Sequence, residues 1–561
     1  MVEAHRFFRK QAHEWLLLNG VEAIGARAAA IETVVRDLLQ MVVIDLSADE
    51  NAQEIFETLN ARGAQLTAAD LIKNFIFQRL LESEADVEGA YQRYWKEFET
   101  GFWEVEISLG RLRYPRSSIF LNHWLIARTG EEVVAREVFS RFKSFADFDF
   151  GSPMTELLQQ VHRAAFVYRQ FIVAASSHAR PIDRLGLFGY RTSVLESEVI
   201  KPLVLYLLDP QEPKIPDAQL NRVLDVVESW MVRRMLVRAT TKSYSQVISD
   251  LVTQLRKSER MRAGDLVEEY FAGQTSGAAY WPDDDEVRGE LRSLLAYRRL
   301  RRGRLRMVLE AFEDYYRGWR AGNNGLGGER VVRGKYAIEH VMPRKWSMHW
   351  SSPGGTQGEA ERDRLIHTIG NLTLLTGRLN SKVSNAPWLG ANGKRQGLEA
   401  HDVLLLNREL LRKVKDAWTD EGIRARSDEM ARIAVEIWPA PEGHRSGFSD
   451  EKARPRHKVE LIDLINAGLL EPGMSLFARH QKFSDRIATL LPDGRIDVDG
   501  TVFESPSRAA GFITGKVTNG WWYLLVDQTS RRSLRAVRRD YIDSLAGDVE
   551  DDEDEDSEDE E

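Results

Sequence analysis

The sequence predicts an α+β protein of several domains, in which a mostly helical N-terminal and middle region precedes two segments that contain short strands. The chain has 561 residues, which is enough for about three or four domains. Apolar residues recur at helical spacing as far as residue 320, and β-prone segments bounded by turn residues follow near 335–375 and 477–526. Helices and strands therefore occupy different parts of the chain, which is typical of the α+β class.

Changes in composition predict where the domains begin and end. The stretch 439–455 is rich in proline, glycine, serine and charge, as linkers are, and the end of the chain is almost entirely acidic. We expect a helical segment over 1–80, a helical domain over 81–320, a ββα domain over 321–438, a linker over 439–455, a small α+β domain over 456–545 and a disordered acidic tail over 546–561.

One helix start in the N-terminal part is well defined. The sequence Leu66-Thr67-Ala-Ala-Asp70-Leu71 has the form of a capping box with a hydrophobic staple from Leu66 to Leu71. The residues that follow form an apolar stripe at helical spacing, namely Ile72, Phe75, Ile76 and Leu80. We expect this stripe, and similar ones in 200–208 and 224–237, to face the core.

The composition excludes some classes of protein. No stretch approaches the roughly 18 apolar residues of a membrane span, and no apolar signal region opens the chain. The chain has no cysteine, which excludes disulfides and thiolate zinc sites and fits a reducing compartment. We therefore expect a cytoplasmic protein with no membrane partner.

The net charge of −9 hides a basic body. The last fourteen residues, 548–561, hold twelve acidic side chains and no basic one, so the rest of the chain carries +3. A mildly acidic isoelectric point therefore does not exclude nucleic-acid binding. The tail either keeps the chain soluble or competes with nucleic acid for the basic surfaces. A dense basic run before residue 307 is either a solvated helix face or a phosphate contact, and comprises Arg298, Arg299, Arg301, Arg302, Arg304 and Arg306.

The most informative residues are Glu339-His340, Asn371 and Asn380. Hydrolysis of a phosphodiester needs a base that activates water and a divalent cation that neutralises charge on the phosphate. An imidazole suits the base role, and carboxylate and amide oxygens suit Mg²⁺. Neighbours on a strand point to opposite faces, so Glu339 and His340 can serve one site only where the strand ends or twists. Pro343, three residues later, is consistent with that.

The local sequence fits such a site. A glycine-rich loop precedes a short strand over 335–343, and 369–375 is a second β-prone segment with Asn371 near its start. After the turn at 376–378, the stretch 379–384 has the character of a helix that carries Asn380 with Lys382 beside it. Two strands and a helix around one ion form the ββα-metal arrangement.

This segment resembles the HNH domain of GmrSD-type restriction endonucleases over residues 335–400. The shared motifs are Ile338-Glu-His-x-x-Pro343, Ile369-Gly-Asn-Leu-Thr-Leu-Leu375 and Asn380-Ser-Lys-Val-Ser-Asn385. The spacing of nine residues between the asparagines also resembles the HNH domain of CRISPR effector nucleases. The chain departs from these domains in having Glu339 where aspartate is more common, and in a long insert before Asn371.

The resemblance implies a role for each residue of the site. It implies that His340 is the general base, that Asn371 orients the loop that bears it, and that Glu339 and Asn380 bind Mg²⁺ or Mn²⁺. Further residues near the motifs are DNA-binding candidates, namely Arg344, Lys345, Lys382 and Asn385.

A second resemblance lies near the N-terminus. The sequence Ile55-Phe-Glu-Thr-Leu-Asn60-Ala-Arg-Gly63 is similar to the later part of the ParB-like nucleotidase domain of GmrS proteins. That domain begins with a strand-rich half that bears an Asp-Gly-Gln-Gln-Arg motif, which is absent here. We expect that the start is truncated or that another polypeptide supplies this half, and nucleotide regulation stays open. Asn60, Arg62, Asp70 and Asn74 are candidates for a composite pocket.

The small α+β domain carries a third resemblance. Its helix near 457–469, its turns at Pro492-Asp-Gly494 and Asp499-Gly500, its Ser505-Pro-Ser-Arg-Ala-Ala510 segment and its Asn519-Gly-Trp521 segment are similar to the RAMA domain. Proline after Ser505 is typical of a capped helix start. RAMA domains accompany restriction enzymes and adenine methyltransferases and are thought to sense modified DNA. The resemblance implies Ser505, Asn519 and Trp521 as reader candidates.

Together these features predict a modification-dependent HNH endonuclease that cuts modified or foreign DNA in defence against phage. Two alternatives remain: a DNA-binding or regulatory subunit of a split restriction system, and a non-selective DNA-degrading toxin.

Overall fold

The computed structural model describes fifteen stretches of the chain. They are residues 2–18, 20–39, 66–109, 112–176, 183–195, 197–320, 323–324, 330–379, 385–390, 393–401, 403–446, 459–483, 485–516, 518–529 and 531–545. The chain divides into two compact units, 1–66 and 67–561. Four predictions fall wholly or mostly outside these stretches: residues 380–384 of the helix expected over 379–384, with Asn380 and Lys382, the candidates Asn60 and Arg62, most of the linker, and the acidic tail.

The described residues of the first unit, 2–18 and 20–39, are largely helical, as the sequence predicted. Helix α1 (Val2–Leu17) is followed by α2 (Ile24–Thr33), which continues into a short π-helical turn (Val34–Leu38). The guanidinium of Arg27 lies 4.5 Å from the centre of the Trp15 ring. No residue of α2 is buried in the structure.

The second unit begins with the capping box that the sequence predicted. The Thr67 hydroxyl accepts a hydrogen bond from the Asp70 N–H (3.2 Å), and the Asp70 carboxylate accepts one from the Thr67 N–H (3.1 Å). Helix α4 (Ala68–Glu82) buries the predicted stripe, namely Ile72, Phe75, Ile76 and Leu80. The prediction of both the helix start and its buried face is confirmed.

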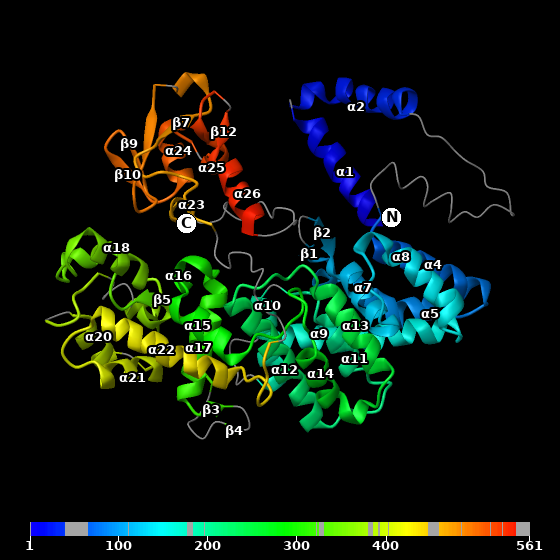
Figure 1. Ribbon diagram of the computed structural model, residues 1–561. Helices are drawn as coiled ribbons and strands as arrows, with labels where there is room; N and C mark the ends of the chain where they lie inside the picture. The colour runs from blue at the N-terminus through cyan, green and yellow to red at the C-terminus, as the bar shows by residue number, and fades with distance from the viewer. Residues whose placement is uncertain are drawn as a thin grey trace. The chain divides into compact units, whose positions relative to one another are not determined.

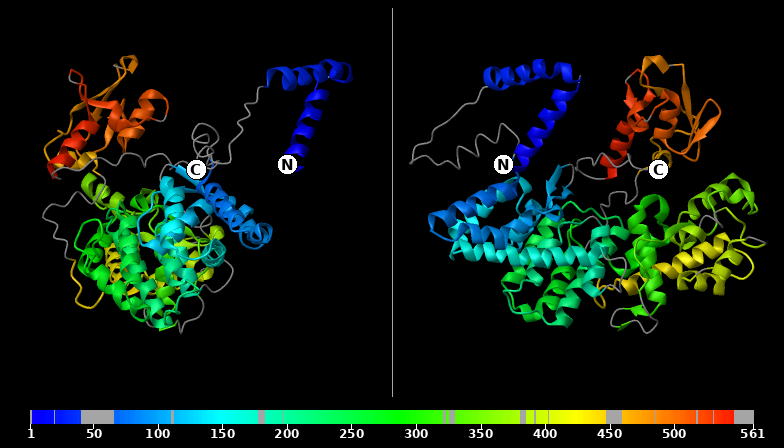
Figure 2. Two further views of the ribbon diagram at one scale, coloured as in Figure 1. Left: turned by 90° about the vertical axis from the view of Figure 1, so that its right-hand side faces the viewer. Right: turned by 180° about the vertical axis from the view of Figure 1, so that it is seen from behind.

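A large helical region follows α4, with one core that contains most of its aromatic residues. Helices α10 and α12 pack together, and α12 packs against α14, as two opposite views show (Figures 1 and 2). The elements are α5 (Val87–Ala90), α6 (Gly101–Glu104), β1 (Glu106–Leu109), β2 (Leu112–Pro115), α7 (Arg116–Thr129), α8 (Val138–Ser144), α9 (Met154–Ser176), α10 (Arg184–Val194), α11 (Lys201–Leu207), α12 (Asp217–Leu236), α13 (Tyr244–Arg256) and α14 (Ala263–Ala272).

The predicted strand pair of the central domain is present. Strand β5 (Ala337–His340) pairs antiparallel with β6 (Leu372–Leu375), with His340 opposite Leu372. The pair lies among α15 (Asp284–Ser293), α16 (Ala296–Arg299), α17 (Arg302–Tyr316), β3 (Trp319–Arg320), β4 (Asn323–Asn324), α18 (Gly355–Leu365), α20 (Lys394–His401), α21 (Leu405–Lys413) and α22 (Asp420–Ile437). Apolar residues of α17 and α22 share one core with β6, so the strand is fully buried.

Helix α22 holds the turn that leads into β6, a short 3₁₀ helix over Ile369–Asn371. The guanidinium of Arg426 donates to the carbonyl oxygens of Gly370 (2.7 Å) and Leu372 (2.9 Å), and Ser427 Oγ accepts from the Gly370 N–H (3.1 Å). A Cβ at position 370 would lie 2.2 Å from the Ile423 carbonyl oxygen. Glycine is therefore needed here because the backbone of α22 approaches the turn so closely.

The C-terminal domain has an antiparallel six-stranded sheet in the order β10-β9-β8-β7-β11-β12. Helix α24 packs on β9 and β10, and α26 packs on β11 and β12. The elements are α23 (Leu461–Asn466), β7 (Ser475–Ala478), β8 (Ile487–Leu490), β9 (Ile496–Val498), β10 (Thr501–Phe503), α24 (Pro506–Thr514), α25 (Gly520–Tyr523), β11 (Leu524–Asp527), β12 (Arg532–Ser533) and α26 (Leu534–Leu545). The mixture of helices and small sheets confirms the α+β prediction.

Candidate active site

Asn371 joins three segments at the base of the site through four side-chain hydrogen bonds. Its Oδ1 accepts hydrogen bonds from the Met342 N–H and the Trp418 indole N–H, both 2.8 Å. Its Nδ2 donates to the carbonyl oxygens of Met342 and Ile366, both 2.9 Å. Asn371 is 0% exposed, so all the bonds that its amide makes are to the protein. The segment that follows His340 is therefore fixed on both its N–H and C=O sides, which fits the positioning role that the resemblance implied.

His340 is the last residue of β5, so the strand ends where the sequence analysis required it to end or twist. The Val341 N–H donates to the Asn371 carbonyl oxygen (2.8 Å), which extends the pairing by one bond. The His340 side chain is buried, and its ring lies 4.2 Å from the ring of Tyr297 in α16. Adjacent Glu339 is directed to a different partner, as alternation along a strand requires.

A second histidine contacts His340. The Nε2 atom of His340 and the Nδ1 atom of His367 are 3.3 Å apart, within hydrogen-bonding distance. The His367 ring is also stacked on Tyr297, with ring centres 5.8 Å apart, and its carbonyl oxygen accepts from the Tyr297 N–H (3.0 Å). The exposed Arg302 guanidinium lies 3.6 Å from the centre of the Tyr297 ring. Two imidazoles, a phenol and a guanidinium thus form one connected group.

Both imidazoles are held in the neutral form. Burial lowers the pKa of His340 to about 2, and the charges of Arg344, Lys394 and Arg302 act in the same direction. Burial lowers the pKa of His367 to about 3, and nearby arginines again contribute. A neutral imidazole keeps a lone pair that can take a proton, but a pKa this low makes the ring a weak base. An anionic phosphate beside the ring would raise its pKa toward the range that a general base needs.

Glu339 forms an ion pair with Lys394, the first residue of α20. The ammonium of Lys394 donates both to the Glu339 carboxylate and to the His340 carbonyl oxygen. The Lys394 side chain is 2% exposed and that of Glu339 13%. Burial raises the pKa of Glu339 although Lys394 opposes it, and burial lowers the pKa of Lys394. Lys394 therefore links the end of β5 to a helix that is more than fifty residues later in the chain.

The surroundings of the two histidines are strongly positive. Arg298, Arg302 and Arg344 are exposed, and their charges add to the effect of burial in lowering the pKa of His367. Of these, Arg298 and Arg302 belong to the basic run that the sequence analysis identified as either a solvated face or a phosphate contact. Arg304 and Arg306 of the same run instead donate to the carbonyl oxygens of Leu195 and Tyr336. Only part of the run therefore faces the site.

The remaining central candidates are Lys345, Asn380, Lys382 and Asn385. Lys345 and Asn385 are exposed, and Asn380 and Lys382 lie outside the described residues. Across the stretches that the structure describes, three or more acidic or histidine side chains nowhere gather in a way that could hold a metal ion. Glu339 precedes His340 on β5 and offers a carboxylate, and its metal-binding role stays a prediction.

The reader candidates of the C-terminal domain include two helix caps. The Ser505 hydroxyl accepts from the Arg508 N–H at the start of α24, and the Asn519 Oδ1 accepts from the Trp522 N–H at the start of α25. The capped start at Ser505 with proline next to it is as predicted. Trp521 is 9% exposed and belongs to the domain core, whereas its neighbour Trp522 is 40% exposed.

Trp522 lies in a basic, aromatic surface that we call the Trp522 patch, formed by Trp522, Arg479, His480 and Arg531. The Arg479 guanidinium lies 4.2 Å from the centre of the Trp522 ring and donates to the Trp522 carbonyl oxygen (3.0 Å). Arg531 donates to the Arg479 carbonyl oxygen (3.2 Å), and burial lowers the pKa of Arg479, with the charge of Arg531 acting in the same direction. The His480 and Trp522 rings are 6.3 Å apart.

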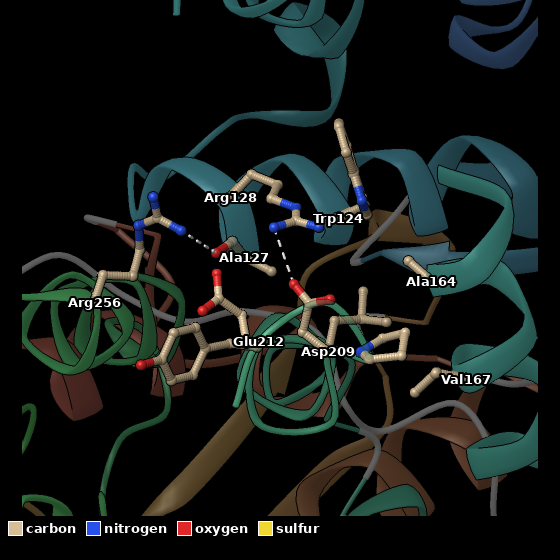
Figure 3. Close-up of a pocket in the computed structure, with 11 residues that line it drawn as sticks. Trp124, Ala127, Arg128, Ala164, Val167, Asp209, Glu212 and Arg256 are labelled. Atoms are coloured by element: carbon tan, nitrogen blue, oxygen red, sulfur yellow. Dashed lines mark hydrogen bonds and ion pairs between the residues drawn. The ribbon is translucent and has the colours of Figure 1, made fainter. Parts of the chain in front are cut away.

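One cavity lies elsewhere, between α7, α9, α11 and α13 in the helical region (Figure 3). Arg128 and Asp209 form an ion pair of 2.9 Å across it, and Arg256 donates to the Ala127 carbonyl oxygen (3.3 Å). Its volume of about 20 Å³ is close to that of one water molecule. The cavity is therefore too small for a substrate.

Sequence reasoning missed three parts of this geometry: His367, Lys394 and the exposure of Trp522. His367 had a detectable signal, because it lies four residues before Asn371 in the same motif-bearing segment. Lys394 had none, since it is more than fifty residues from Glu339.

None of the helices within the described parts is both long and apolar enough to cross a membrane.

Comparison with known families identifies the class of protein as a nuclease that acts on DNA in restriction. Residues 1–77 match the GmrSD restriction endonuclease N-terminal domain, and residues 281–433 match the C-terminal domain of GmrSD restriction endonucleases. Residues 442–547 match the domain described as Restriction Enzyme Adenine Methylase Associated, RAMA. No curated protein matches the chain. Together the three matches support a GmrSD-type restriction endonuclease that carries a RAMA domain.

Proposed function

We propose that this restriction endonuclease cuts modified or foreign DNA by an HNH mechanism that depends on Mg²⁺ or Mn²⁺. The observation that carries the proposal is the placement of His340: a buried, neutral imidazole at the end of a strand, anchored by Asn371 and surrounded by exposed arginines. A base beside a concentration of positive charge is suited to a substrate whose reacting group is an anionic phosphodiester.

The donor set beside His340 fits a hard divalent cation in a limited way. Glu339 offers a carboxylate oxygen, and Mg²⁺ is commonly held by one or two carboxylates together with water and substrate phosphate oxygens. Lys394 already neutralises that carboxylate, so phosphate oxygens would supply much of the negative charge around the ion. When bound, the cation would neutralise charge on the scissile phosphate and on the leaving oxygen.

The chain's own residues then have separate tasks. Arg298, Arg302 and Arg344 bind the phosphates of the backbone and hold the strand over the site. His340 takes a proton from the attacking water, whose oxygen forms the new bond to phosphorus. Asn371 keeps the His340 loop in place through its four hydrogen bonds. One such site cuts one strand, and two sites give a double-strand break.

In this proposal the RAMA domain biases cutting toward modified DNA. The Trp522 patch supports a DNA contact, because an exposed indole can stack on a base while neighbouring guanidinium groups pair with phosphates. Ser505 and Asn519 remain the candidates that the resemblance implies, and each caps the start of a helix. A second polypeptide that supplies a nucleotidase half remains a further proposal.

Plasmid cleavage tests the function. Modified and unmodified plasmid, each with and without Mg²⁺, would be incubated with the full chain and with His340→Ala. We expect Mg²⁺-dependent cutting of modified plasmid, and loss of cutting but not of DNA binding in the variant. His349→Ala is the matched control, because His349 is an exposed histidine of the same domain.

The same assay separates the alternatives. Absence of cutting by the intact chain would favour a DNA-binding or regulatory subunit. Equal cutting of both plasmids would favour a non-selective toxin. Retained nicking by His340→Ala would refute the assignment of the base.

A further inference from the structure

The ring of His340 makes one hydrogen bond within the part of the chain that the structure describes, through Nε2 to His367. Its Nδ1 atom makes none there. A neutral imidazole carries a single proton, on one nitrogen or the other, and a hydrogen bond at one nitrogen fixes which. The direction of the bond between His340 and His367 therefore decides which nitrogen of His340 has a lone pair for a proton.

His367 is well placed to control this choice because its own position is fixed. Its side chain is buried, its ring is stacked on Tyr297, and its carbonyl oxygen accepts from the Tyr297 N–H (3.0 Å). Three residues on, Gly370 is held against α22 by Ser427. With a pKa lowered by burial to about 3, His367 presents a neutral ring that can accept through Nδ1.

We infer that His367 orients His340 for catalysis: the Nε2–H of His340 donates to Nδ1 of His367, and Nδ1 of His340 is left free to receive the proton from water. His367 is thus a positioning residue that acts through His340. This inference rests on the proposed function, because the base role of His340 belongs to it.

The opposite direction of this hydrogen bond would leave His340 with no free lone pair to take a proton from water. If His367 donated through Nδ1, the lone pair on His340 Nε2 would be used, and its Nδ1 would already carry the proton. In the inferred direction the proton passes from water to His340 Nδ1, the water oxygen bonds to phosphorus, and the bond from phosphorus to the leaving oxygen breaks. The leaving oxygen takes its proton from solvent. The positive ring that results keeps its Nε2–H bond to His367, now strengthened by charge.

Two variants of His367 test the inference by activity. His367→Phe keeps an aromatic ring beside Tyr297 but cannot accept a hydrogen bond, whereas His367→Asn retains an acceptor oxygen close to the position of Nδ1. We expect His367→Phe to lower kcat for plasmid nicking by about 10- to 100-fold with little change in KM. His367→Asn should recover part of this loss, and His349→Phe, at an exposed position, should nick like the parent chain.

A spectroscopic readout makes the test independent of cutting. Nitrogen NMR of the full chain labelled with ¹⁵N-histidine, without DNA or metal, reports the tautomer of each ring, and His340→Gln assigns the His340 signals. We expect the Nε2–H tautomer for His340 in the parent chain and its loss or mixing in His367→Phe. A Nδ1–H tautomer in the parent, or an unchanged tautomer in His367→Phe, overturns the inference.

The two kinds of failure remain distinguishable. If the parent chain does not nick DNA, the proposed function fails while the tautomer still reports the orientation. If the parent nicks and His367→Phe nicks equally well, the inference fails while the function stands.

Discussion

Replacing Asn371 by aspartate tests the geometry at the base of the site with almost no change of shape. The new carboxyl keeps the oxygen that accepts from Met342 and Trp418. Its second oxygen replaces the Nδ2 donor and lies against the carbonyl oxygens of Met342 and Ile366, both 2.9 Å from that position. Three oxygens then meet in a fully buried place, so the carboxyl is stable only when it is protonated.

The loss of folding stability in Asn371→Asp comes mainly from keeping the new carboxyl protonated. Holding an aspartate protonated in the folded chain costs about 4 kcal/mol at pH 7 and about 1.5 kcal/mol at pH 5, given its unfolded pKa of about 3.9. The protonated group donates to only one carbonyl, and the lost bond adds about 1 kcal/mol at either pH. The folded pKa is raised above the unfolded value, so the folded state binds more protons and the variant loses stability as the pH rises above about 4.

Urea unfolding followed by circular dichroism measures this cost. The free energy of unfolding of Asn371→Asp is expected to fall below that of the parent by about 5 kcal/mol at pH 7 and about 2.5 kcal/mol at pH 5. Asn385→Asp is the matched control, since Asn385 is exposed and should change stability by about 0.5 kcal/mol or less. An equal deficit at the two pH values, or a deficit no larger than that of the control, would refute the bonding of Asn371.

Three further predictions concern the surrounding residues. Lys394→Met should lower the free energy of unfolding in urea by about 3 kcal/mol, because it leaves the buried Glu339 carboxylate unpaired, and adding Glu339→Gln should recover part of that loss. Arg344→Ala should weaken DNA binding in a fluorescence-anisotropy titration and reduce the slope of log affinity against log salt by about one, as expected for one phosphate contact. Trp522→Ala should weaken DNA binding by about 1–3 kcal/mol without lowering the melting temperature, whereas Trp521→Ala should lower the melting temperature because Trp521 lies in the core.

Local patterns were enough to predict several elements. The capping box of Thr67 and Asp70 and the capped start at Ser505 each depend on residues only three apart, and both are present. The strands β5 and β6 were also predicted, because a short apolar run bounded by glycine or proline favours a strand. The helix expected over 379–384 lies mostly outside the described residues, so it stays a prediction.

The site could be predicted only in part. Its candidate base, His340, and its anchoring asparagine, Asn371, were found because both lie in motifs. Their surroundings were not found, since Tyr297, His367 and Lys394 come from three segments that meet only when α16, the turn before β6 and α20 pack around the end of β5. The neutral state of both imidazoles also follows from burial, which is a property of the packed molecule.

By itself, the sequence determined the α+β class, the helix caps, the two strands and the residues that mark a nuclease of the GmrSD type. Those depend on which residue types stand a few positions apart, because local hydrogen bonds and alternation along a strand reach no further. Tertiary structure alone decided which of two adjacent tryptophans enters the core, which arginines of one basic run face the histidines, and which lysine binds Glu339. Such choices depend on which side of an element the rest of the fold covers, and no local pattern carries that information.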